Sequence, residues 1–228
     1  MRKLRRGQTD NTVLLVAVGV GVLLLAGLLV FMLMPKEDLK PIKIGKVTIT
    51  YVRKDAVIEW KNAAVEKNVE EVYEEYGYVP TFEGNSLTGY DAAEDDAKGR
   101  LAEYLNAVVK RFSQLAKASL ANVVKQSGEQ GENVNAEVLT TEVSKMVQQI
   151  QTQAKITGAV PIVRYRLGGK YHVIIFFNPN IALKLLEDQA SAIENLARKY
   201  GVQSRILFDE VNKTLKEAYK GTPLENQQ

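Results

Sequence analysis

Residues 13–34 form an uninterrupted apolar segment, VLLVAVGVGVLLLAGLLVFMLM, which constrains this chain more than any other feature. It holds 22 consecutive residues without a charged or strongly polar side chain. The hydrocarbon core of a bilayer, about 30 Å thick, is spanned by about 20 helical residues, and a helix satisfies its own backbone hydrogen bonds there. A core helix of a globular protein fits less well, because the segment is apolar on all sides. The sequence therefore predicts a transmembrane anchor at 13–34 in contact with membrane lipid.

A cleavable signal peptide is the main alternative for this segment. Such peptides carry an apolar stretch of about 7–15 residues followed by a cleavage site of the form small-x-small. Here the apolar run is longer and ends in FMLMP at 31–35, without that site. We therefore expect an anchor that is not cleaved.

The charges that flank the segment predict its orientation. Residues 36–40 carry two basic and two acidic side chains, whereas four basic residues precede the segment: Arg2, Lys3, Arg5 and Arg6. The positive-inside rule keeps a basic tail, 1–12, in the cytoplasm and exports the remainder. We expect a single-pass protein of a bacterial inner membrane, with a polar stalk at 35–41, a periplasmic α/β domain at 42–220 and a flexible tail at 221–228.

Charge and cysteine content exclude several classes of function. The whole chain has a formal net charge of +3, and the segment 1–12 alone accounts for it with four basic residues and Asp10. A domain that binds nucleic acid normally presents a basic face, so we expect no nucleic-acid partner. The chain has no cysteine, which excludes disulfides, thiolate metal sites and cysteine nucleophiles.

The exported region begins with a strand-like alternation of side chains, which is followed by the period of a helix. In IKIGKVTITYV the alternation of β-branched residues with threonines predicts a strand over 42–52, with Gly45 at a bulge or at the strand start. An amphipathic helix is then predicted over 56–76, ending at Gly77, from the stripe Val65, Val69, Val72 and Tyr76. The stretch 77–90 contains a proline and three glycines, which predicts a loop with room for a short strand.

Two longer helices follow. Apolar steps of four and three predict a helix over 91–126, with the stripe Ala97, Leu101, Leu105, Val108, Phe112, Leu115 and Ser119. The polar linker SGEQGEN at 127–133 separates it from a helix predicted over 135–153. The apolar stripe of that second helix is Leu139, Val143, Met146, Ile150 and Ala154, and its glutamines at 148, 149, 151 and 153 are expected to be mostly exposed.

The C-terminal third contains the clearest β pattern. Two strand-like runs, 155–167 and 170–177, flank a Gly-Gly pair and predict a β-hairpin, with Pro161 at an edge or bulge. Asn178-Pro179 predicts the start of a helix with the stripe Ala182, Leu186, Ala190, Ile193 and Ala197, and a last helix is predicted over 205–219. The fold class expected is α+β: one N-terminal transmembrane helix, then a small sheet with a β-hairpin packed against several amphipathic helices.

Two segments, GYDAAEDDAKGRLAEYLNAVVKRF and TGAVPIVRYRLGGKYHVIIFF, resemble the surface lipoproteins of the Helicobacter type and the N-terminal domain of the flagellar assembly protein FlgT. The resemblance covers residues 87–186. It implies a compact α/β domain of the cell envelope without known catalysis, although this chain lacks the lipidated cysteine of those lipoproteins. The residues that carry the resemblance are Gly89, Ala93, Ala97, Arg100, Ala102, Gly158, Val160, Gly169, Tyr171 and Val173.

Few residues of the sequence could take part in catalysis or bind a ligand. His172 is the only histidine, and no GxSxG motif accompanies it, so we interpret it as an ordinary strand residue. Asp91, Glu94, Asp95 and Asp96 fit neither a calcium loop nor a fixed carboxylate pair, and are interpreted as a solvated helix start. We therefore predict no catalytic, cofactor-binding or metal-binding residues.

Two features suit binding to other proteins. A glutamate-rich face at 66–75 is typical of a solvated helix surface, but with Tyr73 and Tyr76 it could also bind a basic partner. The aromatic residues Tyr51, Trp60, Tyr73, Tyr76, Tyr78, Phe82 and Tyr90 gather between 51 and 90. They belong either to the core or, where exposed, to an interface.

These observations predict a membrane-anchored, non-enzymatic cell-envelope protein. It would act as a scaffold or assembly module by contacts with other envelope proteins or with further copies of itself as a homo-oligomer. The alternatives are a periplasmic carboxylate-based cell-wall hydrolase, which needs only two carboxylates in a cleft, and a ligand-binding sensor domain, which needs an apolar pocket.

Overall fold

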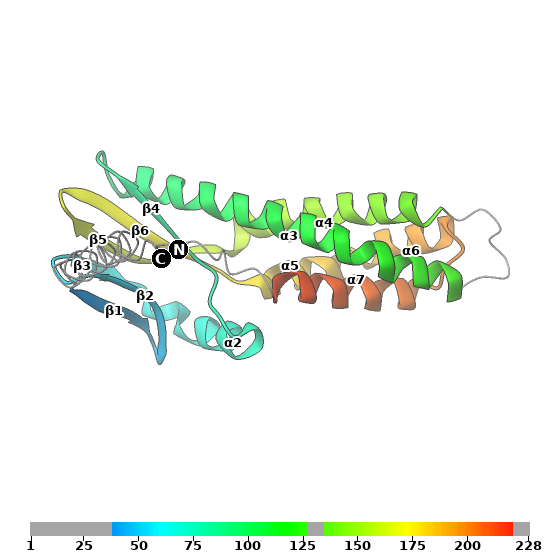
Figure 1. The fold of residues 1–228 in the computed structure, drawn as a ribbon, viewed down its shortest axis with the longest axis horizontal. Helices are drawn as coiled ribbons and strands as arrows, with labels where there is room; N and C mark the ends of the chain where they lie inside the picture. The colour runs from blue at the N-terminus through cyan, green and yellow to red at the C-terminus, as the bar shows by residue number, and fades with distance from the viewer. Residues whose placement is uncertain (1–37, 127–134, 221–228) are drawn as a thin grey trace, which may run out of the picture. The chain divides into compact units, whose positions relative to one another are not determined.

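The computed structural model describes residues 38–126 and 135–220 (Figure 1). The predicted anchor, cytoplasmic tail and C-terminal tail, and the linker 127–133, lie outside the described residues. None of the helices within the described ranges has the length and apolar character needed to cross a membrane. The chain forms two compact units, Met1–Leu39 and Lys40–Gln228.

The expected α+β class is confirmed: the described residues contain six α-helices and two small antiparallel sheets. The larger sheet has four strands in the order β3-β5-β6-β4, and its bounds are Val57–Lys61, Ala159–Leu167, Lys170–Phe177 and Thr81–Ser86. The smaller sheet pairs β1 (Leu39–Ile44) with β2 (Val47–Arg53). Strands adjacent in the sequence thus pair in β1–β2 and β5–β6. The paired residues of β3 and β5 are 102 to 109 positions apart, and those of β4 and β6 are 85 to 95 positions apart.

The predicted hairpin is confirmed, but its first strand, β5, begins at Ala159 rather than at 155, because residues 155–158 continue α4. Leu167 is opposite Lys170, and the two glycines between them have φ values of 57° and 78°. Two consecutive residues with positive φ form the turn that matches the twist of the flanking strands, and only glycine adopts it without strain. Pro161 lies at an irregularity of the ladder, as expected of a residue without an N–H group.

The predicted strand 42–52 is wrong in its connectivity. Gly45, with φ of 58°, and Lys46 form a turn that divides it into β1 and β2. Strand β1 begins at Leu39, so it includes the end of the segment expected to be a stalk, 35–41. The alternation was correctly recognised, but a glycine with positive φ starts a new strand here rather than a bulge.

The predicted helix 56–76 begins too early. Residues 57–61 form β3, which pairs with β5, and a short 3-10 helix at Ala63–Val65 leads into α2 (Glu66–Tyr76). The end of α2 at Gly77 is confirmed: its φ is 77°, and its N–H donates to the carbonyl of Tyr73. The loop expected at 77–90 contains β4, which pairs with β6 along its whole length.

Helix α3 (Tyr90–Gln126) links the two halves of the fold and confirms the prediction for 91–126. It packs on β4 and β6 near its start, and on α4 and α7 beyond (Figure 1). Its stripe follows the prediction as far as Phe112, after which Ala116, Leu120 and Val123 are buried in place of Leu115 and Ser119. The change occurs because a stripe of strict four-three steps drifts around a straight helix of 3.6 residues per turn.

The remaining helices are α4 (Ala136–Gly158), α5 (Pro179–Asp188), α6 (Ala190–Lys199) and α7 (Ser204–Tyr219). Helix α4 runs five residues past the predicted end at 153, and one of its glutamines, Gln151, is buried rather than exposed. The single helix expected after Asn178 is two helices, because the chain breaks at Gln189 and leaves Ala190 exposed. The cap by Asn178, whose side chain accepts from the N–H of Asn180, is confirmed.

Candidate functional site

The structure separates the aromatic residues between 51 and 90 into buried and exposed sets. Tyr76 and Phe82 are buried, and Tyr78 and Tyr90 are partly buried. Three rings are exposed: Tyr51 at 61%, Trp60 at 42% and Tyr73 at 49%. Aromatic residues are enriched at protein interfaces, so these three exposed rings mark candidate contact surfaces.

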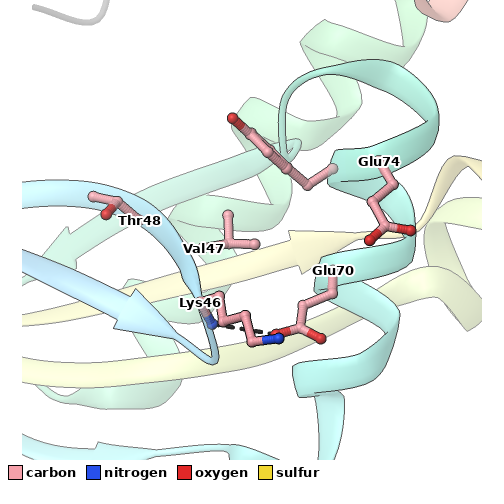
Figure 2. A pocket seen from close by; sticks show the side chains of 6 residues that line it. Lys46, Val47, Thr48, Glu70 and Glu74 are labelled. Carbon is pink, nitrogen blue, oxygen red and sulfur yellow. Dashed lines mark hydrogen bonds between the residues drawn. The ribbon is translucent and has the colours of Figure 1, made fainter.

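Tyr73 lines a pocket of about 430 Å³ between the β1–β2 turn and α2 (Figure 2). The other lining residues are Lys46, Val47, Thr48, Glu70 and Glu74. We call this the α2 pocket. Its strand side presents a lysine, a valine and a threonine, while its helix side presents a phenol ring and two carboxylates.

Helix α2 orients these side chains because its other face is fixed in the core. Val69, Val72 and Tyr76 are buried, so residues 70, 73 and 74 point outward. The Asn62 side chain accepts from the N–H of Ala64 and so caps the 3-10 helix that precedes α2, and α2 itself ends at the left-handed Gly77. The glutamate-rich face of the sequence is thus confirmed as a surface of α2.

The β1–β2 turn is fixed against this helix. The backbone N–H of Lys46 donates to Oε1 of Glu70 at 3.2 Å, as the dashed line in Figure 2 shows. Gly45 has a φ of 58°, and a Cβ atom there would lie 2.6 Å from side-chain atoms of Glu66 and 2.7 Å from Oε1 of Glu70, so another residue would be strained and would displace these carboxylates. One carboxylate therefore holds the turn, and Glu74 is the acid that remains to meet a ligand.

The α2 pocket can bind a cation on a flexible chain. A lysine or arginine side chain from a partner would meet the Glu74 carboxylate and the face of Tyr73, a combination of ion pair and cation–π contact. Within the described ranges, no group of three or more acidic or histidine side chains could hold a metal ion. The chemistry available here is recognition of a basic group.

A second surface lies around Trp60 of β3 and the first turn of α3. The guanidinium of Arg164 lies over the rings of Trp60 and Tyr90, at 5.5 and 5.6 Å from their centroids. Arg166 lies 4.4 Å from the ring centroid of Tyr171. Arg164 and Tyr171 also line a shallow depression of about 520 Å³ beside the first turn of α3. This layer of stacked rings and guanidinium groups holds β3 and β5 against α3.

His172 lies on β6, in agreement with its interpretation as a strand residue, and it belongs to a cluster of side chains on the sheet. Its Nδ1 lies 2.7 Å from Oε1 of Glu83, and the same oxygen accepts from the Tyr165 hydroxyl at 2.6 Å. Burial, followed by the hydrogen bond to Glu83, raises the pKa of Tyr165. The His172 side chain is only 10% exposed, so the cluster cross-links β4, β5 and β6 instead of facing a substrate. Glu83 was missed because cross-strand pairing cannot be read from sequence spacing.

The acidic start of α3 also has structural partners. Glu94 pairs with Lys98 at 2.8 Å and with Arg164 at 3.5 Å. Asp96 accepts from the backbone N–H of Asn85 at 3.0 Å. The interpretation as a merely solvated helix start is therefore incomplete, because two of the four acids join α3 to the sheet.

Comparisons of this chain with protein-family models, curated proteins and solved structures found no match.

Proposed function

We propose that this protein is a membrane-anchored, non-enzymatic component of the bacterial cell envelope that acts as a scaffold or assembly module. The segment 13–34 would hold it in the inner membrane, with the basic tail in the cytoplasm and the α/β domain in the periplasm. The domain would bind other envelope proteins, and its contacts would include further copies of the chain.

The exposed Tyr73 ring beside the Glu74 carboxylate is the observation that carries this proposal. A half-exposed tyrosine costs hydrophobic free energy in water, and nothing in the packing of α2 requires it, because the core stripe of that helix lies on the other face. Aromatic side chains next to charges are typical of the central residues of protein interfaces. The partner expected at the α2 pocket is a protein segment that presents a lysine or arginine.

The hydrolase alternative makes a different demand on the pocket. Hydrolysis of a glycosidic bond needs two carboxylates on opposite sides of the scissile bond. Glu70 and Glu74 lie one turn apart on the same face of α2, and so on the same wall of the pocket. The arrangement therefore favours binding of a cation over a hydrolase with flanking carboxylates.

The decisive measurement is the native mass of the full-length protein after detergent extraction, with co-purifying chains identified by mass spectrometry. A stable set of partners, or a discrete oligomer, would support the scaffold. A monomer without companions would overturn it and favour a search for a ligand or substrate.

Matched variants test whether the α2 pocket is the contact. Tyr73→Ala and Glu74→Lys should lose the companions by an order of magnitude or more, because each removes one of the two groups that meet the basic side chain. Leu87→Ala and Glu217→Lys make comparable changes at exposed positions elsewhere and should retain them. Equal losses for both pairs would assign the contact to another surface.

A further inference from the structure

The three N-terminal strands expose apolar side chains among lysines. Leu39, Tyr51, Val57 and Trp60 are exposed at 46%, 61%, 60% and 42%. Between residues 38 and 61 the sequence places six basic and three acidic side chains. We call these strands together the β1–β3 surface. Trp60 is the only tryptophan of the chain.

Hydrogen bonds bring the lysines of this surface together. Lys40, on β1, donates to the carbonyls of Lys54 and Ala56 in the turn between β2 and β3. Lys61, on β3, donates to the carbonyl of Lys43 on β1 at 3.5 Å. The ammonium groups of Lys40 and Lys61 meet backbone carbonyls here, and among the residues that the structure describes neither of them forms an ion pair with a carboxylate.

Two of the three acids in this range already have cationic partners. Asp55 pairs with Arg53 at 3.1 Å. Glu59 lies 3.8 Å from Arg166 and accepts from the Tyr90 hydroxyl at 2.6 Å. With six basic and three acidic side chains, residues 38–61 carry a formal net charge of +3, although residues 13–228 taken together are neutral.

The position of these strands in the chain restricts where they can lie. Residues 35–38 alone separate the proposed anchor from Leu39, the first residue of β1. An extended chain spans at most about 3.6 Å per residue, so β1 begins within about 18 Å of the end of the apolar segment. A chain anchored through 13–34 would thus keep β1 close to the lipid headgroups.

We propose that the β1–β3 surface lies against the anionic phospholipid headgroups of the membrane that anchors the chain; the inference rests on the proposed anchor. Tryptophan and tyrosine favour the membrane–water interface because their rings combine an apolar body with a polar group. Lysines near the surface are attracted by anionic lipid within about a Debye length. The β1–β3 surface combines both, next to the tether.

This orientation also separates the two surfaces of the domain by charge. Helix α2 carries five glutamates and one lysine, so an anionic membrane repels it. Basic strands bound to lipid would leave the acidic α2 pocket accessible to a basic protein partner. The tether would then use a separate part of the chain, whereas the lipid contact and the protein contact would adjoin each other at the β1–β2 turn, because Lys46, Val47 and Thr48 line the α2 pocket.

The single tryptophan permits a direct test with the full-length protein in nanodiscs. Trp60 emission is recorded in discs of phosphatidylcholine alone and in discs that also contain phosphatidylglycerol, with and without lipid brominated near the headgroup. The inference predicts a blue shift and quenching by brominated lipid in the anionic discs, both reversed by high salt. Neutral discs should show much weaker quenching.

Charge variants assign the effect to the lysines. Lys43→Gln and Lys61→Gln should each lower the ratio of lipid-bound to unbound domain roughly fivefold, the factor expected for one basic residue near an anionic surface. Lys184→Gln and Lys213→Gln remove exposed charges from α5 and α7 and should leave quenching unchanged.

Each other outcome overturns the inference in a distinguishable way. Quenching that does not depend on phosphatidylglycerol or salt would show that the tether alone keeps Trp60 near the lipid. A blue shift without quenching would show that protein covers the ring. A chain that enters the disc with Trp60 unquenched would overturn the lipid contact alone, whereas a chain that does not enter the disc would overturn the anchor as well.

Discussion

The hydroxyl of Tyr219, in the last turn of α7, donates a 2.6 Å hydrogen bond to Oε1 of Gln151 in α4. Both side chains are buried, and burial raises the pKa of the phenol. The other end of the amide is not satisfied: among the described residues, Nε2 of Gln151 has no hydrogen-bond partner. A half-satisfied polar pair therefore joins two helices in the interior.

Replacing this pair should show strong coupling. Gln151→Leu removes the acceptor of a buried hydroxyl, and Tyr219→Phe leaves the whole amide unsatisfied, so each should lower the free energy of unfolding by about 1–3 kcal/mol. The double variant replaces both partners with apolar groups and should cost less than the sum. Urea unfolding of the four proteins measures the coupling. Additive losses would mean that the hydrogen bond contributes nothing beyond packing.

Substitution by alanine should change stability in opposite directions at Gly84 and at Gly99. A Cβ atom at Gly84 in β4 would lie 2.0 Å from the carbonyl oxygen of Ala93, because α3 crosses the strand at that point. Gly84→Ala should therefore separate strand and helix and cost about 1–3 kcal/mol. Gly99 lies in α3 with nothing within 4 Å of its Cβ position, so Gly99→Ala should stabilise the protein by up to about 1 kcal/mol. Thermal unfolding of both variants checks the signs.

The elements predicted correctly are those whose signals are local. The Gly168-Gly169 turn, the cap at Asn178 and the end of α2 at Gly77 each depend on the conformational preference of one or two residues. Strand β3 was missed because VIEWK has five residues, two of them charged, and most of its side chains are exposed, so no alternation appears. It forms a strand because β5 offers a ladder to it, which is a non-local cause.

The same distinction between local and non-local signals applies to the candidate site. The glutamate-rich face with Tyr73 could be predicted from the 3.6-residue period of α2, because helix periodicity decides which side chains point outward. That this face forms a pocket could not be predicted, since the other wall comes from a turn at Gly45 and Lys46, where the sequence analysis predicted one strand over 42–52. The Glu83–His172–Tyr165 cluster brings together residues 89 and 82 positions apart. Only the strand order places them side by side.

An exposed ion pair provides a pH-dependent prediction. Nζ of Lys199 donates to Oε1 of Glu142 at 2.7 Å, and this bond holds the pKa of Glu142 below its usual value. A carboxyl whose pKa is lowered by folding stabilises the native state above its unfolded pKa, and this contribution disappears as the pH falls through the lowered value. The Tm difference between the natural protein and Lys199→Gln should thus be largest near neutral pH and vanish in acid. Lys67→Gln, which removes a longer surface pair at 3.6 Å, should show a smaller dependence.

Substitutions at Arg164 test whether its positive charge or the planar shape of its guanidinium stabilises this contact. Its guanidinium contacts Trp60, Tyr90 and the Glu94 carboxylate, and its Nε is buried without a hydrogen-bond partner among the described residues. Lysine keeps the charge but cannot stack as a planar group, so Arg164→Lys should lose about 0.5–1 kcal/mol for each ring contact. Arg164→Gln should lose the ion pair in addition. Trp60 fluorescence follows the ring directly during urea unfolding, and its emission should shift to longer wavelength in both variants. Equal stability of Arg164→Lys and the natural protein would mean that charge alone, paired with Glu94, holds β5 against α3.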